Sequence, residues 1–225
     1  MRPSFRAGFT LIEVLVVVTI IGIMAGLLLP AIQQSRAASR RMTCQSNLRQ
    51  WTIAVLRYAD DHQGDLPRRG QGMQRAERFD RMEDWFNALP PYLESTPLVR
   101  TLTTPVQGVW VCPEFVGETP PRFLYGMNMW LSTWHSPTPD NLKKVGALSS
   151  MVFMADGPGE FCALLPSRES YSPVARHTGV VNVAFLDGHV AAIDGDEAGC
   201  GTGLQHRDDV RWKPPDSPWE GPHVH

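Results

Sequence analysis

The sequence predicts an α+β fold in which one long amino-terminal helix packs on a small antiparallel β-sheet. An apolar run over residues 9–29 is followed by an apolar stripe at helical spacing that reaches Tyr58. Short segments rich in β-branched and aromatic residues then occur between residues 109 and 193. We therefore expect five parts: a short basic leader (1–8), a transmembrane helix (9–29), its amphipathic continuation (30–63), an α+β head (64–194) and an irregular tail (195–225).

The apolar run from Phe9 to Leu29 has the length of a membrane-spanning helix. Its 21 residues carry a single charge, Glu13. At ~1.5 Å per residue such a helix spans roughly 30 Å, the thickness of a bilayer core. A carboxylate inside a bilayer costs about 2.5–3.5 kcal/mol on insertion scales, so Glu13 is expected to have a partner.

Residues 8–14, with the sequence Gly-Phe-Thr-Leu-Ile-Glu-Val, resemble the signal of type IV prepilins and type II secretion pseudopilins. The resemblance implies that a membrane prepilin peptidase cleaves after Gly8 and that the new terminus, Phe9, is methylated. Glu13 then becomes the fifth residue of the mature chain, where the amine of Phe9 on a neighbouring subunit would neutralise it. A plain anchor leaves Glu13 unexplained, and the apolar region of a secretory signal peptide is shorter, ~7–15 residues.

Two further features of this helix are typical of assembly. Gly22 and Gly26 form a G-x-x-x-G pair, which lets helices approach closely in lipid, although small residues are common in membrane helices. Pro30 has no N–H to donate to the carbonyl of Gly26 and is expected to kink or loosen the helix. Pilins carry a proline at the same distance from the cleavage point, which extends the resemblance.

The helix is expected to continue past the membrane and to end near Gly64, with Pro67 forbidding continuation. The apolar stripe on one face comprises Cys44, Leu48, Trp51, Val55 and Tyr58. The opposite, polar face comprises Arg40, Gln45, Asn47, Arg49 and Arg57. A short helix should follow, with Asp80 as its cap, Glu83 completing a capping box and Pro90 ending it.

The β segments are expected at residues 109–112, 123–128, 151–155 and 180–193. The last range contains Asp187-Gly188 between two strand-like runs. That dipeptide favours a two-residue type I′ hairpin turn, because both central residues need positive φ. The hairpin would pair Leu186 with His189 and Phe185 with Val190.

A second resemblance lies in the same stretch. His177, nine further residues and then Asp187-Gly188 resemble the H-X9-DG element of a bacterial prepilin-like family, whose carboxy-terminal domain has an uncertain role. Residues 44–50, 58–61 and 111–113 also resemble that family, so the likeness covers much of the chain in scattered patches. The tail from Asp194 has no counterpart in it.

Several side chains near this element have the chemistry of metal ligands. His177, Asp156 and Asp187 would meet at one end of the sheet with His189 nearby, a set that suits calcium or, through its imidazole, zinc. The simpler interpretation is that Asp187-Gly188 is a turn and that His177 fixes the entry of the strand through a hydrogen bond. We favour this simpler interpretation and expect no metal and no cofactor.

The four cysteines, Cys44, Cys112, Cys162 and Cys200, permit three disulfide pairings outside the inner membrane. No C-x-x-C pair is present, which argues against a zinc ribbon or a thioredoxin-like centre. The sequence does not choose among the pairings. Cys44 with Cys112, and Cys162 with Cys200, is our working expectation.

Composition narrows the function further. A net charge of -2 gives no field that would favour nucleic acid, and we expect none as a partner. Ser170, Ser172 and His177 lie close in sequence without a nucleophile elbow, so we expect no enzyme. The resemblance implies a pseudopilus or type IV pilus-like filament subunit. Its partners would be prepilin peptidase, other subunits and inner-membrane lipid.

The expected location is the bacterial inner membrane, spanned once, with the head in the periplasm or on a filament. The charges leave the orientation open, because Arg2 and Arg6 before the apolar run are countered by Arg36 and Arg40 after it. The orientation is therefore implied by the prepilin resemblance alone. The alternative function is a membrane-anchored periplasmic binding or sensing domain that uses a prepilin signal without joining a filament.

Overall fold

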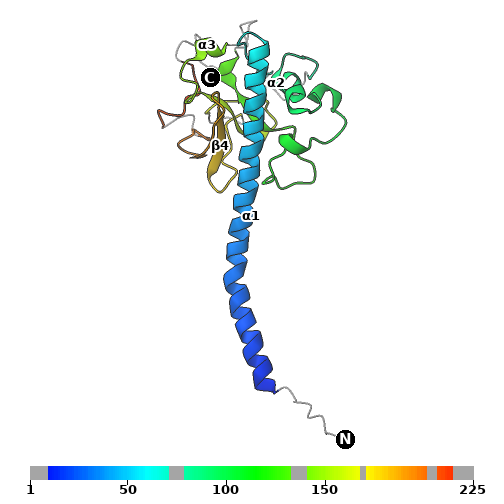
Figure 1. Cartoon of the computed structure of the whole chain (residues 1–225), viewed down its shortest axis with the longest axis vertical. Helices are drawn as coiled ribbons and strands as arrows, with labels where there is room; N and C mark the ends of the chain where they lie inside the picture. The colour runs from blue at the N-terminus through cyan, green and yellow to red at the C-terminus, as the bar shows by residue number, and fades with distance from the viewer. Residues whose placement is uncertain (1–9, 71–78, 133–140, 168–170, 202–206, 215–225) are drawn as a thin grey trace. The chain divides into compact units, whose positions relative to one another are not determined.

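A computed structural model describes residues 10–70, 79–132, 141–167, 171–201 and 207–214 of the chain. It divides into two compact units, residues 1–39 and residues 40–225. The long helix α1, Leu11–Asp61, contributes its first part to one unit and its second part to the other (Figure 1). The structure confirms the predicted α+β class, a long amino-terminal helix with a five-stranded sheet.

The part of α1 in the first unit is an apolar helix with no buried face. Its large apolar side chains between Leu11 and Ile32 are all 47–82% exposed. An 18-residue window of α1 has a mean hydropathy of 2.7, and none of that window is buried, so the helix is long and apolar enough to span a membrane. α1 continues through Pro30, so the proline does not end the helix.

The part of α1 in the second unit packs as the apolar stripe predicts. Cys44, Leu48, Trp51 and Val55 are fully buried and Tyr58 is half-buried. The placement of Asn47 on the polar face was wrong. This side chain is buried, because its amide donates to the carbonyl of Val111 at 3.0 Å and to the hydroxyl of Tyr125 at 3.2 Å.

The end of α1 is as expected. The backbone N–H of Gly64 donates to the carbonyl of Ala59 at 2.7 Å, and Gly64 has a φ of +99° that favours glycine. The next helix, α2 (Trp85–Ala88), is shorter than expected and differently capped. Its N-cap is Asp84, whose side chain makes no capping hydrogen bond, so the capping box expected at Asp80 and Glu83 is not formed.

The sheet has the order β3-β1-β2-β4-β5. Its strands are β1 (Phe123–Asn128), β2 (Val152–Gly159), β3 (Ala163–Leu164), β4 (Val180–Phe185) and β5 (Val190–Asp194). All neighbours pair antiparallel except β3, which pairs parallel to β1 and makes the sheet mixed. The remaining helices are η1 (Pro90–Leu93), η2 (Leu98–Arg100), η3 (Gly108–Trp110), η4 (Met129–Leu131) and α3 (Leu142–Val145).

Two strand expectations need correction. Residues 109–112 form no strand, and η3 covers Gly108–Trp110 instead. The ring of Trp110 packs edge-on against that of Trp51, with 4.8 Å between the two ring centroids. The strand expected at residues 151–155 was also expected to end at the turn-favouring dipeptide Asp156-Gly157. β2 instead continues to Gly159, because Tyr125 of β1 pairs with Asp156 and Phe123 with Gly159. Backbone pairing with a neighbouring strand thus overrides the turn preference of Asp-Gly.

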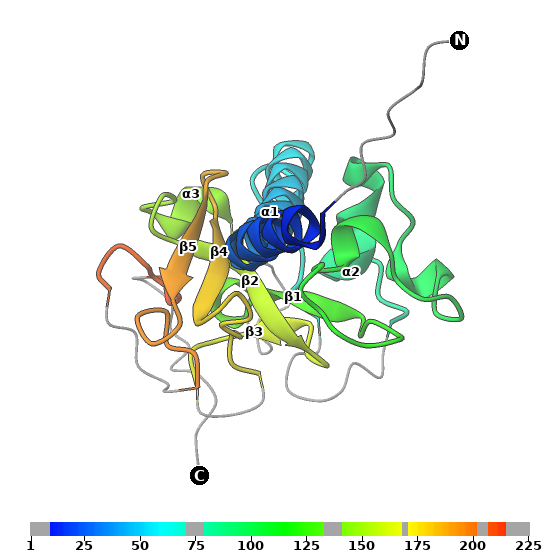
Figure 2. The same ribbon diagram turned by 90° about the horizontal axis from the view of Figure 1, so that it is seen from below.

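The two faces of the sheet carry separate hydrophobic clusters. The first contains the buried stripe of α1, apolar side chains of α2, Ala184 of β4 and Leu186, which directly follows β4. The second contains Val181, Val183 and Phe185 of β4 with Val210 and Trp212 near the carboxyl end. Figure 2 shows the second part of α1 over one face of the sheet. The alternation along β4 therefore follows the sequence pattern.

The β4–β5 hairpin forms, but its turn and register differ from the prediction. Gly188 donates to the carbonyl of Phe185 and Phe185 donates to the carbonyl of His189, which leaves a three-residue loop. Ala184 therefore pairs with Val190, one residue out of the predicted register. Gly188 has a φ of +102° and Asp187 does not, as in a type I turn closed by a glycine bulge.

Candidate functional site

The start of α1 holds the glutamate of the predicted assembly signal. Both the N–H of Thr10, at 2.8 Å, and its hydroxyl, at 2.7 Å, donate to Oε2 of Glu13. The N–H of Glu13 donates back to the hydroxyl of Thr10 at 3.3 Å. This is a capping box, in which a Thr and a Glu three residues later satisfy the first N–H groups of a helix. Glu13 thus has a partner inside its own chain, which the sequence interpretation missed although T-x-x-E signals it.

Of the other residues expected to act in processing and assembly, the structure describes the two glycines of α1 but not the cleavage position. Gly8 and Phe9, the predicted cleavage and methylation positions, lie outside the described residues. Gly22 and Gly26 lie on the apolar part of α1, and a Cβ atom added at either meets nothing within 4 Å. The glycine pair is therefore an open surface on the described helix.

In the head, a disulfide joins α1 to the loop after η3. Cys44 and Cys112 are bonded with their Cα atoms 5.2 Å apart, and both side chains are fully buried. The expected second disulfide is not formed, since Cys162 and Cys200 both carry thiols. Cys162 belongs to the hydrophobic cluster under α1, whereas Cys200 packs against the cluster on the opposite face of the sheet.

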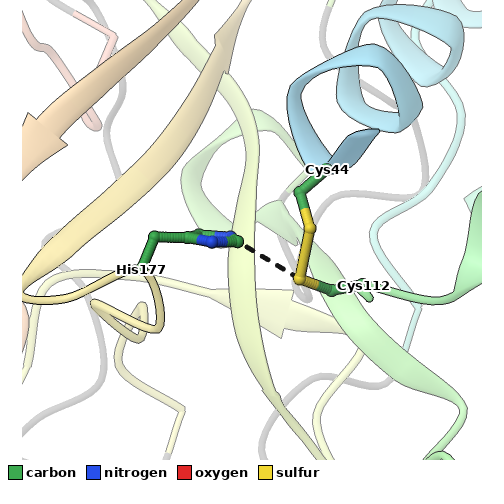
Figure 3. Close-up of side chains that lie close together, drawn as sticks. All are labelled: Cys44, Cys112 and His177. Carbon is green, nitrogen blue, oxygen red and sulfur yellow. Dashed lines mark hydrogen bonds between the residues drawn. A yellow bond between two sulfur atoms is a disulfide. The ribbon is translucent and has the colours of Figure 1, made fainter. Parts of the chain in front are cut away.

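His177 lies against this disulfide. Its Nε2 atom is 3.5 Å from Sγ of Cys112, and the ring points toward that sulfur (Figure 3). A tight turn places it there: His177 and Val180 exchange backbone hydrogen bonds around Thr178 and Gly179, which both have positive φ. The turn with two positive φ values expected at Asp187-Gly188 thus occurs directly before β4 instead. The backbone hydrogen bonds of His177 thus lie at the entry of that strand.

Asp156 of β2 completes the cluster. Its Oδ2 atom lies 3.5 Å from Nε2 of His177 and accepts hydrogen bonds from the backbone and side-chain amides of Asn182. Burial raises the pKa of Asp156 to about 7. Burial also lowers the pKa of His177, which favours the neutral imidazole, and in that form one ring nitrogen is able to bind a proton or a metal ion.

Asp187 does not join this cluster. Its Oδ1 atom lies 2.6 Å from Nδ1 of His189 and accepts the N–H of the same residue, at the exposed hairpin loop. The ring of His189 stacks on Phe185 with 4.2 Å between centroids. The four side chains considered from the sequence thus form two pairs, Asp156 with His177 and Asp187 with His189.

The constellation that sequence reasoning missed is Cys44, Cys112 and His177. Among the described residues, these three are the one group of at least three His, Cys, Asp or Glu side chains whose ligand atoms all lie within 4.8 Å of one another. The cysteines are 68 residues apart, and His177 follows Cys112 by a further 65. No local spacing joins such distant residues, so only the packing of α1 over the sheet reveals the group.

Comparisons with known proteins identify two regions. The model of the prokaryotic N-terminal methylation motif matches residues 4–29. The model of a family of proteins of unknown function (DUF1559) matches residues 33–109. No curated protein and no solved structure matches the chain.

The chain therefore carries a prepilin-type methylation signal followed by a DUF1559 region, consistent with a type IV pilin- or pseudopilin-like protein with a carboxy-terminal domain. The signal and the apolar helix together fit a membrane-anchored, single-pass protein. Both matches end before His177 and Asp187, so the H-X9-DG element lies outside them.

Proposed function

We propose that this chain is a structural subunit of a pseudopilus or type IV pilus-like filament. Prepilin peptidase removes residues 1–8, Phe9 is methylated, and residues 9–29 enter the filament core while the head lies in the periplasm or on the filament surface. The observation that carries the proposal is the methylation signal at residues 4–29, which leads directly into a helix with no buried apolar side chain between Leu11 and Ile32.

Burial of the exposed apolar side chains of α1 provides the driving force for the proposed membrane insertion and assembly. Side chains that are 47–82% exposed all around a helix require lipid or other helices to cover them. The open surface at Gly22 and Gly26 allows a second helix to approach closely, where van der Waals packing favours association in lipid. Other subunits of the same type provide such helices, so lipid and neighbouring subunits are the proposed partners of this segment.

Glu13 has two roles in this account: it caps the start of α1, and its charge pairs with the amine of a neighbouring subunit. Substitutions at Glu13 can remove one role without the other. Glutamine at this position completes a capping box as glutamate does, but it carries no charge for the amine of Phe9 on a neighbouring subunit. If charge pairing drives assembly, Glu13→Gln and Glu13→Ala both abolish filaments. If only the cap matters, Glu13→Gln assembles normally and the pairing part of the proposal is wrong.

Shearing of cells distinguishes the filament subunit from a mere anchor. A filament subunit appears in the sheared surface fraction of wild-type cells, and it disappears from that fraction when prepilin peptidase is absent. A binding or sensing domain that uses the signal for processing alone stays with the membrane in both cases. For a short periplasmic pseudopilus, cross-linking between single cysteines introduced at exposed Val16 and Ile20 replaces shearing, and absence of cross-linked multimers contradicts assembly.

A further inference from the structure

We propose that the reduced form of this chain binds one thiophilic metal ion of the Zn²⁺ class through Cys44, Cys112 and His177. The proposal concerns the head alone and does not depend on filament assembly. The same three residues would then join α1 to the rest of the head in both redox states, by a disulfide under oxidising conditions and by a metal ion under reducing conditions.

The geometry of the three ligand atoms fits a tetrahedral ion. With Zn–S distances of ~2.3 Å and Zn–N distances of ~2.0–2.1 Å, the edge between a sulfur and a nitrogen ligand is about 3.6 Å and that between two sulfurs about 3.8 Å. Nε2 of His177 already lies 3.5 Å from Sγ of Cys112, and all three atoms lie within 4.8 Å of one another. Opening the disulfide is therefore the main movement that binding requires.

The surroundings of the three residues resemble those of a closed structural metal site. Cys44 and Cys112 are fully buried and His177 is 5% exposed, so the ligand atoms are shielded from bulk solvent. A tetrahedral ion would take its fourth ligand from Asp156 or from one bound water. Asp156 lies beside Nε2 of His177, which places a buried carboxylate next to the cation. Its second oxygen, Oδ1, is buried and has no hydrogen-bond partner among the described residues, an unusual deficit that a nearby cation or bound water would relieve.

The chemistry balances through a thiol or phosphine reductant. A phosphine supplies two electrons and becomes its oxide, while water supplies the oxygen of the oxide and the two protons that convert the disulfide into the thiols of Cys44 and Cys112. Two molecules of a thiol reductant supply the same electrons and protons and end as their own disulfide. Metal binding then displaces both thiol protons into the solvent, because the thiolate is the metal ligand. The neutral ring of His177 binds through Nε2 with its proton on Nδ1, an atom that has no hydrogen-bond partner among the described residues. A proton that stands on Nε2 in the disulfide form moves to Nδ1 by exchange with the solvent. A small-molecule disulfide reverses the process: it accepts two electrons from the two thiolates and becomes two thiols with protons from the solvent, and the ion is released as the Cys44–Cys112 bond re-forms.

Titration of the full-length protein in detergent with Co²⁺ as an optical probe tests the site. Cys162→Ser/Cys200→Ser is the background, because it removes the thiols outside the group and leaves all three proposed ligands. After reduction with a phosphine, we expect one Co²⁺ per chain with the visible absorption of a tetrahedral thiolate complex, displaced by Zn²⁺. The oxidised background protein should bind none.

Two further variants show whether the proposed ligands hold the ion. Adding Cys112→Ser should remove the cobalt absorption. Adding His177→Asn, which leaves the disulfide cysteines intact, should weaken binding by at least the ~10–100-fold that loss of an outer-shell partner costs. No cobalt absorption in the reduced background protein, or binding that survives both substitutions, would overturn the proposal.

The thermal midpoint of the unmodified chain gives a second readout that needs no variant. Zn²⁺ should raise the midpoint of the reduced protein and leave that of the oxidised protein unchanged, because an ion that binds only the folded state stabilises it. Equal effects of Zn²⁺ on both forms, or no effect on either, would likewise overturn the proposal.

Discussion

The carboxylate of Asp156 holds Asn182 by two hydrogen bonds, one from its backbone N–H at 2.8 Å and one from its side-chain amide at 3.0 Å. Both residues are fully buried, and they lie on neighbouring strands β2 and β4. The link adds side-chain hydrogen bonds to the backbone pairing of β2 and β4, close to the turn that places His177 before β4. It therefore ties the candidate site to the centre of the sheet.

Replacement of Asn182 by alanine should cost about 1–3 kcal/mol of unfolding free energy, because a buried carboxylate loses one of its donors. The backbone N–H remains, so the fold should persist. Urea unfolding followed by circular dichroism measures the change. A loss below ~0.5 kcal/mol, the size found for exposed surface positions, would contradict the importance of the link.

Asn47 provides a comparable test on α1. Asn47→Ala leaves the carbonyl of Val111 and the hydroxyl of Tyr125 without their donor in a buried setting, so we expect a loss of about 1–3 kcal/mol. Arg49→Ala, two positions further along the same helix at an exposed site, is the matched control and should change stability by less than ~0.5 kcal/mol. Equal effects of the two substitutions would show that Asn47 behaves as a surface residue.

The helix was predictable because its signal is periodic and local. The stripe through Leu48 and Trp51, and the stop at Gly64, follow from residues within one or two turns of each other. Asn47 escaped prediction because its partners, Val111 and Tyr125, lie 64 and 78 residues away. A polar residue on the boundary of an apolar stripe has no local feature that distinguishes a solvated position from a buried one.

The residues of the β4–β5 turn predicted the position of the hairpin but not its register. Asp187-Gly188 correctly predicted where β4 ends and β5 begins, but it did not separate a two-residue turn from a three-residue turn with a bulge. Both turn types accept glycine at a positive φ, so one residue of register was undetermined. The grouping of Cys44, Cys112 and His177 was beyond sequence reasoning, since three distant segments meet only in the packed head.

The buried carboxyl of Asp84 should make stability depend on pH. Burial raises its pKa to about 7, and Oδ2 has no hydrogen-bond partner among the described residues. An unfolded aspartate titrates near ~3.9, so between about pH 4 and 7 the folded chain binds a proton that the unfolded chain has lost. The stabilising contribution of this group is therefore complete below about pH 4 and is lost as the pH rises through 7.

Asp84→Asn removes this titration. At pH 8 we expect the variant to be more stable than the natural chain by on the order of 1 kcal/mol or more, with the two converging toward pH 4. Urea unfolding at pH 4, 6 and 8 tests the expectation. Parallel stability curves for the two proteins would show that Asp84 does not carry a raised pKa in the folded state.

The disulfide between Cys44 and Cys112 predicts how many cysteines an alkylating reagent labels. Alkylation of the denatured, unreduced chain should label two cysteines, Cys162 and Cys200, and prior reduction should raise the count to four. Cys44→Ala/Cys112→Ala should lower stability by about 2–4 kcal/mol, because the bond closes a long loop in the unfolded chain. Mass spectrometry gives the count. A count of four before reduction would contradict the Cys44–Cys112 disulfide, and a count of zero would contradict thiols at Cys162 and Cys200.

The intact mass of the protein from its native membrane tests the central claim most directly. We expect a chain that begins at Phe9 and carries one added methyl group, as the methylation signal at residues 4–29 requires. Such a mass places the chain on the prepilin pathway, in which the helix from Leu11 onward is available for assembly. A chain that still begins at Met1 without methylation would contradict the claim and leave α1 as an ordinary membrane anchor.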